Sequence, residues 1–243
     1  MKSVPSSVVV VTPVWRPELS DDELIRLRIT ERASQSWQRI ILHPDGMPIE
    51  PIQQQLPAWH FQSCEPHRLS SVQSYSSWLL QPDFYARFRD FEFMLIAQLD
   101  SVLLREPPPA AFDYDYLGAP WDPPWRVLVF GGQMRIIRAF GRMWGKKLVV
   151  GNGGLSLRSI EQFVAASHQL ASKVDPAVLR TANEDAVWSY FAKDLGVHVA
   201  PVPIASIFHD LRHNADLNIE NFYGIHGLRS ETPTANLALR NWQ

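Results

Sequence analysis

A single acidic residue, Asp100, ends one of the most apolar runs of the chain, the segment LIAQLD at residues 95–100. Ligands of open α/β sheets bind beyond the carboxyl ends of the strands. A carboxylate placed there can hold a divalent cation, and the cation can in turn hold a diphosphate. The alternative is that Asp100 only begins a turn or caps the segment that follows.

Two further acids, Glu184 and Asp185, stand side by side in the motif NED at residues 183–185. Asn183 can cap a helix, and acids in a first turn interact favourably with the helix dipole, so a structural role is a strong alternative. The chemical interpretation is that one carboxylate serves as a general base. Because adjacent residues do not share a helix face, the two acids can have different roles.

The segment VVGNGGLSLRS at residues 149–159 places three glycines in four positions. Glycine costs backbone entropy, so the turn must need either positive φ angles or the close approach of another group. Its pattern predicts a strand, a turn and then a helix. Gly153 and Gly154 would let a phosphate or a sugar lie against the backbone. A tight turn that needs positive φ is the alternative.

His226 lies in the motif FYGIHG, residues 222–227, where it could be a metal or phosphate ligand. A structural role is the alternative for a lone histidine. The eight histidines are dispersed, and the chain has no complete Walker A, GxGxxG, HExxH or GxSxG motif. Kinase, simple dinucleotide-binding, zinc protease and α/β-hydrolase functions are therefore weakly supported.

The elements that must position these residues alternate between strand and helix, which is the order of an α/β fold. Apolar runs predict strands at residues 7–14, 39–44, 91–100 and 147–154, an edge strand within 112–121, and a late strand at 197–208. Helical patterns predict helices at residues 21–37, 74–88 with a break at Pro82, 156–173 and 183–196. Ser20 and Glu23 match a capping box, and Gly196 is expected to end the last helix.

Length and composition allow one large domain or two small ones. Because no linker divides the chain, we expect one α/β domain over residues 1–243, with a tail at 228–243 after the core at about 8–227, the extent of the family resemblance given below. With 23 Lys and Arg against 25 Asp and Glu, nothing at the level of the whole chain indicates nucleic acid as a partner. Cys64 is the only cysteine, which excludes an internal disulfide or a CxxC metal site and favours a reducing, cytoplasmic location. No stretch approaches the ~18 apolar residues of a membrane span.

Five segments occur in an order that resembles a family of glycosyltransferases first catalogued as a domain of unknown function, DUF5672. The segments are QLD, YDYLGAPW, VGNGGLSLR, NEDAVW and YGIHG. TPVW near the start and SYSSWLLQPDFY are also similar to that family, so the resemblance runs from about Val8 to Gly227. The arrangement is similar to the wider GT-A class of nucleotide-sugar transferases, which implies a Rossmann-like mixed sheet flanked by helices.

The resemblance to the GT-A class implies a role for each candidate residue. Asp100 and His226 would hold a divalent cation, Mn²⁺ or Mg²⁺. Asp185 would be the catalytic base, and Glu184 would orient the acceptor or brace the glycine turn. The residues implied to bind the donor are Thr12, Pro13, Tyr75, Gln98, Asp100, Gly153 and Gly154.

The chain departs from the GT-A pattern at the metal motif. That class usually carries Asp-x-Asp, whereas this chain reads Asp100-Ser101-Val102. Either the cation has fewer protein ligands, or the activity is independent of metal, or the site is inactive. Trp121 and Trp125 offer flat faces of the kind on which sugars pack, although burial in a core is the commoner fate of tryptophan.

The resulting prediction is transfer of a sugar, with inversion, from a nucleotide sugar such as a UDP sugar to a hydroxyl of a glycan or lipid-linked acceptor. This activity would serve glycan or polysaccharide biosynthesis. Two alternatives stay open, because fold alone does not fix function. One is a non-catalytic protein that binds sugars or nucleotides, and the other is a metal-dependent nucleotidyltransferase.

The segment at residues 135–147 is basic, and no acidic residue occurs between Pro123 and Ile160. Cations at spacings of three and four residues would share one face of a helix. These cations are Arg135, Arg138, Arg142 and Lys146. Such a helix could contact an anionic acceptor or the inner face of a membrane. An ordinary surface helix is the alternative.

Overall fold

A computed structural model describes residues 5, 7–136, 145–211, 218–228 and 233–242. A six-stranded sheet lies at its centre, in the order β3–β2–β1–β4–β10–β6. The strands are β1 (Val8–Pro13), β2 (Gln38–Pro44), β3 (His60–Cys64), β4 (Phe93–Ala97), β6 (Tyr116–Gly118) and β10 (Leu155–Ser159). Strands β1 to β4 are parallel, whereas β10 is antiparallel to both β4 and β6. The predicted mixed sheet is therefore confirmed.

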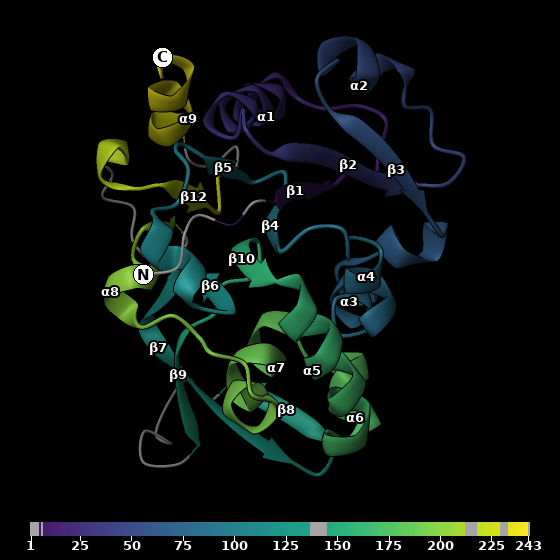
Figure 1. Ribbon diagram of the computed structural model, residues 1–243, viewed down its shortest axis with the longest axis vertical. Coiled ribbons are helices and arrows are strands. Elements are labelled where there is room, and N and C mark those ends of the chain that lie inside the picture. Colours follow the sequence, from purple (N-terminus) through teal and green to yellow (C-terminus); the bar gives the residue numbers. More distant parts are fainter. Residues whose placement is uncertain (1–4, 6, 137–144, 212–217, 229–232, 243) are drawn as a thin grey trace.

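Helices cover both faces of this sheet (Figure 1). They are α1 (Asp21–Ala33), α2 (Glu50–Gln55), α3 (Val72–Trp78), α4 (Pro82–Ala86), α5 (Ile160–Lys173), α6 (Pro176–Thr181), α7 (Glu184–Phe191), α8 (Val202–Ala205) and α9 (Pro233–Arg240). Short 3-10 helices lie at Pro66–Leu69, Pro109–Asp113, Ala192–Leu195 and Ile219–Asn221. Within the described residues, no helix is both long and apolar enough to cross a membrane.

The first four residues of β1, Val8–Val11, are all valine, and the two covered faces of the sheet explain why. Val9 and Val11 point into the core formed with α3, α4, α5 and α7, whereas Val8 and Val10 point into the core formed with α1 and α2. Successive side chains of a strand face opposite sides of its sheet, so a sheet covered on both faces needs apolar residues at every position.

Two three-stranded sheets flank the central one. The first is ordered β11–β12–β5 and the second β8–β7–β9. Their strands are β5 (Ser101–Leu103), β7 (Pro120–Phe130), β8 (Gln133–Ile136), β9 (Lys146–Val150), β11 (Phe208–Asp210) and β12 (Gly224–His226). Strand β12 is parallel to β11 and antiparallel to β5, which places His226 opposite Ser101, the residue after Asp100.

Several predicted boundaries are confirmed. The side chain of Ser20 and that of Glu23 form the predicted capping box at the start of α1. The helix predicted around Pro82 is divided into α3 and α4. Gly196 has a φ angle of 71° and caps the 3-10 turn that follows α7.

Other predicted elements are wrong. Residues 155–159 form strand β10, so the glycine turn joins two strands, and the predicted helix begins only at Ile160. The late strand at 197–208 is replaced by α8 and by β11. The basic helix at 135–147 is contradicted at both ends, where β8 and β9 lie, while Arg138 and Arg142 fall outside the described residues. Strand β4 ends at Ala97, so Asp100 lies in the turn that leads to β5.

Candidate active site

The glycine turn between β9 and β10 allows two side chains of the protein to approach its backbone. A Cβ atom at Gly153 would collide with Oε1 of Glu184, and one at Gly154 would collide with Nε2 of His226. Neither glycine has a positive φ angle. The explanation by positive φ is therefore wrong at both positions. Glycine is needed because Glu184 and His226 lie against the turn.

Asn152 connects this turn to the C-terminal part of the chain. Its Oδ1 accepts a hydrogen bond from the backbone N–H of Gly154 (2.9 Å), which fixes the orientation of the amide. Its Nδ2 donates to Oδ2 of Asp210 (2.5 Å) and lies 3.0 Å from Nδ1 of His226. Asn152, Asp210 and His226 are all buried. The turn is thereby held between β10 and the β11–β12 pair.

The two residues predicted to hold a metal lie together. Nε2 of His226 is 3.3 Å from Oδ1 of Asp100, and Nδ1 of His226 is 3.8 Å from Oδ1 of Asp210. Two neighbouring ligands of one cation, each at ~2.1 Å, would be roughly 3 Å apart, so the Asp100–His226 pair fits two positions of a coordination sphere. Among the described residues there is no group of three or more His, Cys, Asp or Glu that could hold a metal. The remaining ligands would have to come from a diphosphate and water.

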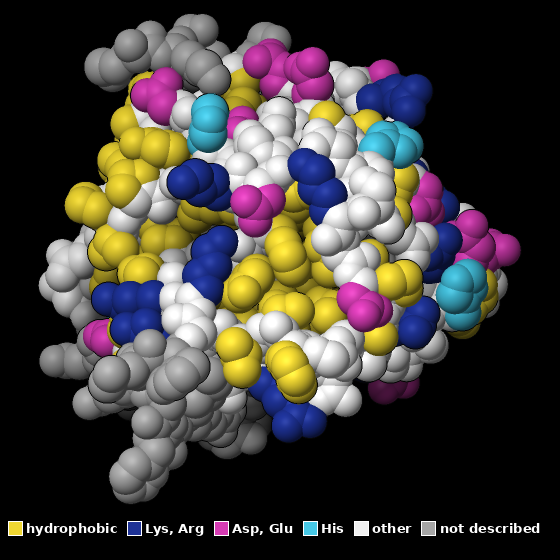
Figure 2. Space-filling model, turned by 90° about the horizontal axis from the view of Figure 1, so that it is seen from below, with side chains coloured by type: hydrophobic (Ala, Val, Ile, Leu, Met, Phe, Trp, Pro, Cys, Tyr) yellow, Lys and Arg dark blue, Asp and Glu magenta, His cyan; other side chains and the backbone are white. Residues whose placement is uncertain are grey.

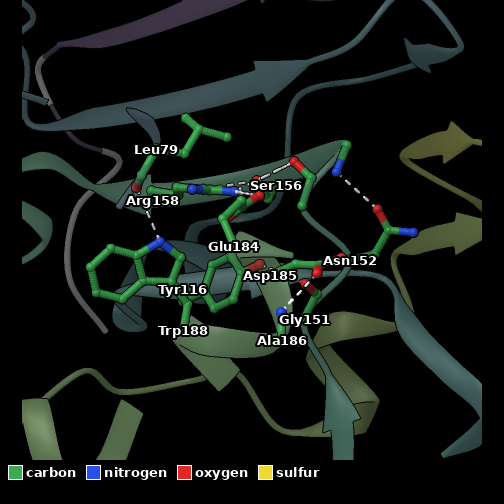
Figure 3. Close-up of polar contacts among 12 residues, drawn as sticks. Leu79, Tyr116, Gly151, Asn152, Ser156, Arg158, Glu184, Asp185, Ala186 and Trp188 are labelled. Carbon is green, nitrogen blue, oxygen red and sulfur yellow. Dashed lines mark hydrogen bonds and ion pairs between the residues drawn. The ribbon is translucent and has the colours of Figure 1, made fainter. Parts of the chain in front are cut away.

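Glu184 is part of a buried ion pair that the sequence patterns do not indicate (Figure 3). Its Oε1 accepts from Nη2 of Arg158 at 3.0 Å. Arg158 also donates to Oγ of Ser156 (3.0 Å) and to the hydroxyl of Tyr85 (2.8 Å). Burial is the largest single effect and lowers the pKa of Arg158. The charge and hydrogen bond of Glu184, together with Tyr85 and Tyr116, outweigh it, so the pKa lies well above its ordinary value. Arg158 therefore keeps its positive charge in the interior.

This pair supports one of the two roles predicted for Glu184, that of bracing the glycine turn. Its Oε1 contacts Arg158, while its Oε2 has no hydrogen-bond partner in the described part of the chain. The helical pattern at residues 156–173 gives Arg158 no role. One sequence signal could have revealed the role of Arg158: it is a cation in an otherwise apolar run. A cation that is buried with such a run needs a buried acid as its partner.

Asp185 occupies a different environment from its neighbour. It is half-buried in the first turn of α7, and its Oδ1 accepts a hydrogen bond from the backbone N–H of Ala186 (2.7 Å). Its Cβ lies 3.2 Å from the position that a Cβ at Gly153 would take. The two adjacent acids thus diverge, Glu184 into the interior and Asp185 beside the turn.

Two cavities open beside these residues. The first, of about 320 Å³, is lined by Pro13, Tyr75, Gln98 and Glu184 among others. The second, of about 610 Å³, is lined by Gln98, Asp100 and His226, together with Arg26 of α1. Trp15, Val72 and Gln98 belong to both linings, so the cavities adjoin.

Two of the residues predicted to bind the donor bear a buried hydroxyl. The Thr12 hydroxyl and the Tyr75 hydroxyl have no hydrogen-bond partner among the described residues. Burial raises the pKa of the Tyr75 phenol, so this group stays protonated and can act as a donor. Thr12 itself is buried and does not line the first cavity, whereas Tyr75 does.

Trp121 and Trp125 lie apart from these two cavities. Their rings stack on each other, with centroids 4.2 Å apart and planes 10° from parallel, and Trp121 is buried. Trp121 lines a third cavity, of about 450 Å³, together with Asp210 and Phe222. The face that Trp121 turns to Trp125 is not open to a sugar.

Comparison with known proteins gives a family and a fold. The family described as "Protein of unknown function (DUF5672)" matches residues 58–221, more than half of the chain. No curated protein sequence matches. The structure is similar to a galactosyltransferase, LgtC, in complex with donor and acceptor sugar analogues, with a TM-score of 0.59, 11% identity, and coverage of 96% of this chain and 95% of that one.

A second similar structure is core-mannan synthase A from Aspergillus fumigatus in its Mn/GDP form. The TM-score is 0.53 at 9% identity, over 85% of this chain and 72% of that one. Both likenesses extend over most of the chain at low identity, and they establish that the central sheet and its helices form a glycosyltransferase fold of the GT-A type.

Proposed function

Because this chain belongs to the DUF5672 family and has a GT-A fold, we propose that it transfers a sugar from a nucleotide-sugar donor to a hydroxyl of an acceptor. The similar structures contain donor and acceptor sugar analogues in one case and Mn and GDP in the other. The proposal extends that chemistry to this chain on the basis of its own cavities and side chains.

The observation that carries the proposal is the junction of the two cavities near the carboxyl ends of β1 and β4. Pro13 is the last residue of β1, and Gln98 directly follows β4. The first cavity, with Tyr75, would take the base and ribose of the donor. The second, with Asp100 and His226, would take the diphosphate, and Gln98 belongs to both.

A divalent cation would be held by Oδ1 of Asp100 and Nε2 of His226. When bound, it would neutralise the charge that develops on the leaving diphosphate. A second carboxylate at residue 102 could not serve this site, since Val102 is fully buried in β5, in a core cluster with Ile225. Arg26 offers positive charge instead: its Nε donates to the carbonyl of Leu99 at 2.9 Å, and it lines the same cavity as Asp100.

Asp185 would act as the general base. As the acceptor oxygen forms its bond to the anomeric carbon, the bond from that carbon to the phosphate oxygen breaks, and the acceptor proton passes to the carboxylate of Asp185. One displacement of this kind inverts the anomeric centre. Glu184 and Arg158 would hold the glycine turn in place beneath the reacting groups.

The test has two stages. A panel of nucleotide sugars, UDP sugars first, is screened for an increase in melting temperature with Mn²⁺ and with a chelator. Each donor that stabilises the protein is then assayed for product release with and without acceptor glycosides. We expect slow release of nucleoside diphosphate, which Asp185→Asn lowers by roughly 10²-fold or more.

Two outcomes would contradict the proposal and indicate a different function. Release of pyrophosphate would indicate a nucleotidyltransferase. Donor binding without turnover under any condition would indicate a non-catalytic protein that binds nucleotide sugars, a function for which the single carboxylate at Asp100 would suffice.

A further inference from the structure

The three-stranded sheet β8–β7–β9 buries only one of its faces. Val127, at the middle of β7, is fully buried and packs with Trp121 and Leu148. Met134 and Ile136 of β8 pack against the same cluster. At the edge of this inner face, Lys146 donates to the carbonyl of Tyr190 and lies over its ring. The alternate residues of these strands must therefore form the outer face.

The register of the strands defines that outer face. On β7 it comprises Arg126, Leu128 and Phe130, which alternate with the inward residues. Lys147 of β9 lies directly opposite Arg126, and Arg135 of β8 lies directly opposite Leu128. Residues directly opposite each other in an antiparallel pair lie on the same side of the sheet. We call these five residues the cationic face.

The cationic face combines opposed like charges with exposed apolar side chains. Both features are unfavourable when the face contacts only water. Arg126 and Lys147 are like charges in directly opposed positions, which destabilises a strand pair. Phe130 is 82% exposed and Leu128 is 43% exposed, beside the Gly131–Gly132 turn. The one acid of these strands is Asp122, near the start of β7, and no Asp or Glu occurs from Pro123 to Ile160, where all the cations of this face lie. Figure 2 shows the molecule from the side on which β7, β8 and β9 lie in Figure 1, with Lys and Arg side chains beside hydrophobic ones.

We infer that the cationic face docks on the surface of an anionic lipid membrane. Lipid phosphates would lie against Arg126, Arg135 and Lys147, and each such cation contributes to attraction by an anionic leaflet. Leu128 and Phe130 would enter the boundary between headgroups and acyl chains, as apolar residues of interfacial segments do. A soluble polyanion would satisfy the cations but would leave both apolar side chains in water, and for this reason the membrane is the partner that fits.

This inference stands apart from the proposed function, because binding to vesicles requires no donor, acceptor or turnover. The experiment is co-sedimentation of the full chain with vesicles of phosphatidylcholine alone or with about one quarter phosphatidylglycerol. It is run in about 0.05 M and about 0.5 M NaCl, because salt screens surface charges. We expect binding only to the anionic vesicles, and at least tenfold weaker binding at the higher salt concentration.

Two double variants separate the contribution of the cations to vesicle binding from that of the apolar side chains. Arg126→Gln with Lys147→Gln should weaken binding to anionic vesicles about tenfold or more. Leu128→Ser with Phe130→Ser should weaken it by a similar factor without changing its dependence on salt. Matched controls are Leu237→Ser, an exposed apolar residue of α9, and the double variant of two exposed arginines elsewhere, Arg28→Gln with Arg89→Gln. The controls should bind as the unaltered chain does, and melting temperatures verify that every variant is folded.

Three results would overturn the inference. The first is equal binding to neutral and anionic vesicles. The second is unchanged vesicle binding by both double variants of the cationic face. The third is binding to heparin as tight as to vesicles and insensitive to Leu128→Ser with Phe130→Ser, which would make an acidic glycan the partner.

Discussion

Arg158 and Glu184 form a 3.0 Å ion pair in the interior, where their side chains are 0% and 5% exposed. Removal of one partner leaves the other charge buried and unpaired. We therefore expect Arg158→Met to lower the free energy of unfolding by about 3–5 kcal/mol, and Arg158→Met with Glu184→Gln to recover a large part of that loss. Urea denaturation measures both values.

The matched control for this pair is Arg240, which contacts Asp22 at 2.8 Å with side chains that are 53% and 29% exposed. Exposed pairs contribute about 0–1 kcal/mol, so Arg240→Met should have little effect. If Arg158→Met were no more destabilising than Arg240→Met, the interior pair would have no special structural role.

Because Gly154 and His226 are in contact, the stability losses caused by substituting each of them should not be additive. Gly154→Ala should destabilise by about 1–3 kcal/mol, because the added methyl group must displace the imidazole. In a His226→Ala background the same change should cost much less. Gly153→Ala collides with Glu184 instead, so its cost should be nearly the same in both backgrounds. Additive behaviour of Gly154→Ala and His226→Ala would contradict the close approach.

Asp185→Asn should retain the fold and the donor affinity but lower turnover by roughly 10²-fold or more, since the amide cannot accept the proton of the acceptor. Donor affinity is measured by calorimetry and turnover by release of nucleoside diphosphate. Nearly unchanged turnover would remove Asp185 from the role of base.

Asp100→Ala should weaken the binding of UDP when Mn²⁺ is present and have little effect when a chelator is present. The reason is that Asp100 acts on the nucleotide through the cation. Asp22 lines the same cavity but forms an ion pair with Arg240 at 2.8 Å, which makes Asp22→Ala the control. Activity that a chelator leaves untouched would show that no metal is needed.

Stability should fall as the pH rises above about 9. Burial raises the pKa of Cys64 from its ordinary value of 9.0 to about 11, and it raises the pKa of Tyr75 above its ordinary 10.0. The unfolded chain therefore loses these protons at a lower pH than the native chain does. The stability they contribute is complete below the unfolded values and is lost as the pH rises toward the folded ones.

Urea midpoints measured from neutral to alkaline pH would test this expectation. Each such group adds about 1.4 kcal/mol per pH unit to the slope within its window. Tyr75→Phe should reduce the slope without loss of stability near neutral pH, because the Tyr75 hydroxyl has no hydrogen-bond partner among the described residues. A slope identical to that of the unaltered chain would show that Tyr75 ionises normally in the native state.

Local sequence signals predicted the strands and caps that depend on neighbouring residues. The apolar run of β1 and the capping box of α1 are of this kind, because burial on both faces and a three-residue hydrogen-bond pattern are visible in one short segment. The resemblance to the GT-A class also implied which residues would lie near one another: Asp100 and His226 are in contact, and Glu184 lies against Gly153.

The elements and contacts that the sequence patterns did not predict depend on partners that are distant in the sequence. LSLRS resembles the start of a helix, but it pairs on both sides with β4 and β6, and these pairings make it a strand. The basic residues around 135–147 have helical spacing, yet Arg135 and Lys147 belong to strands that pair with β7. Arg158 and Asn152 had no motif of their own, because their partners, Glu184 and Asp210, come from elsewhere in the chain.

Strand β12 also determines when the candidate site can be completed during synthesis. His226 and Asn152, which meet beside the glycine turn, are 74 positions apart. In the described structure β12 is the strand that pairs with β5, so β5 lacks a partner while the nascent chain leaves the ribosome. Contacts between such distant segments form late. The glycine turn therefore receives its histidine only after residue 226 has been synthesised, and until then the unpaired edge of β5 is open to other partners.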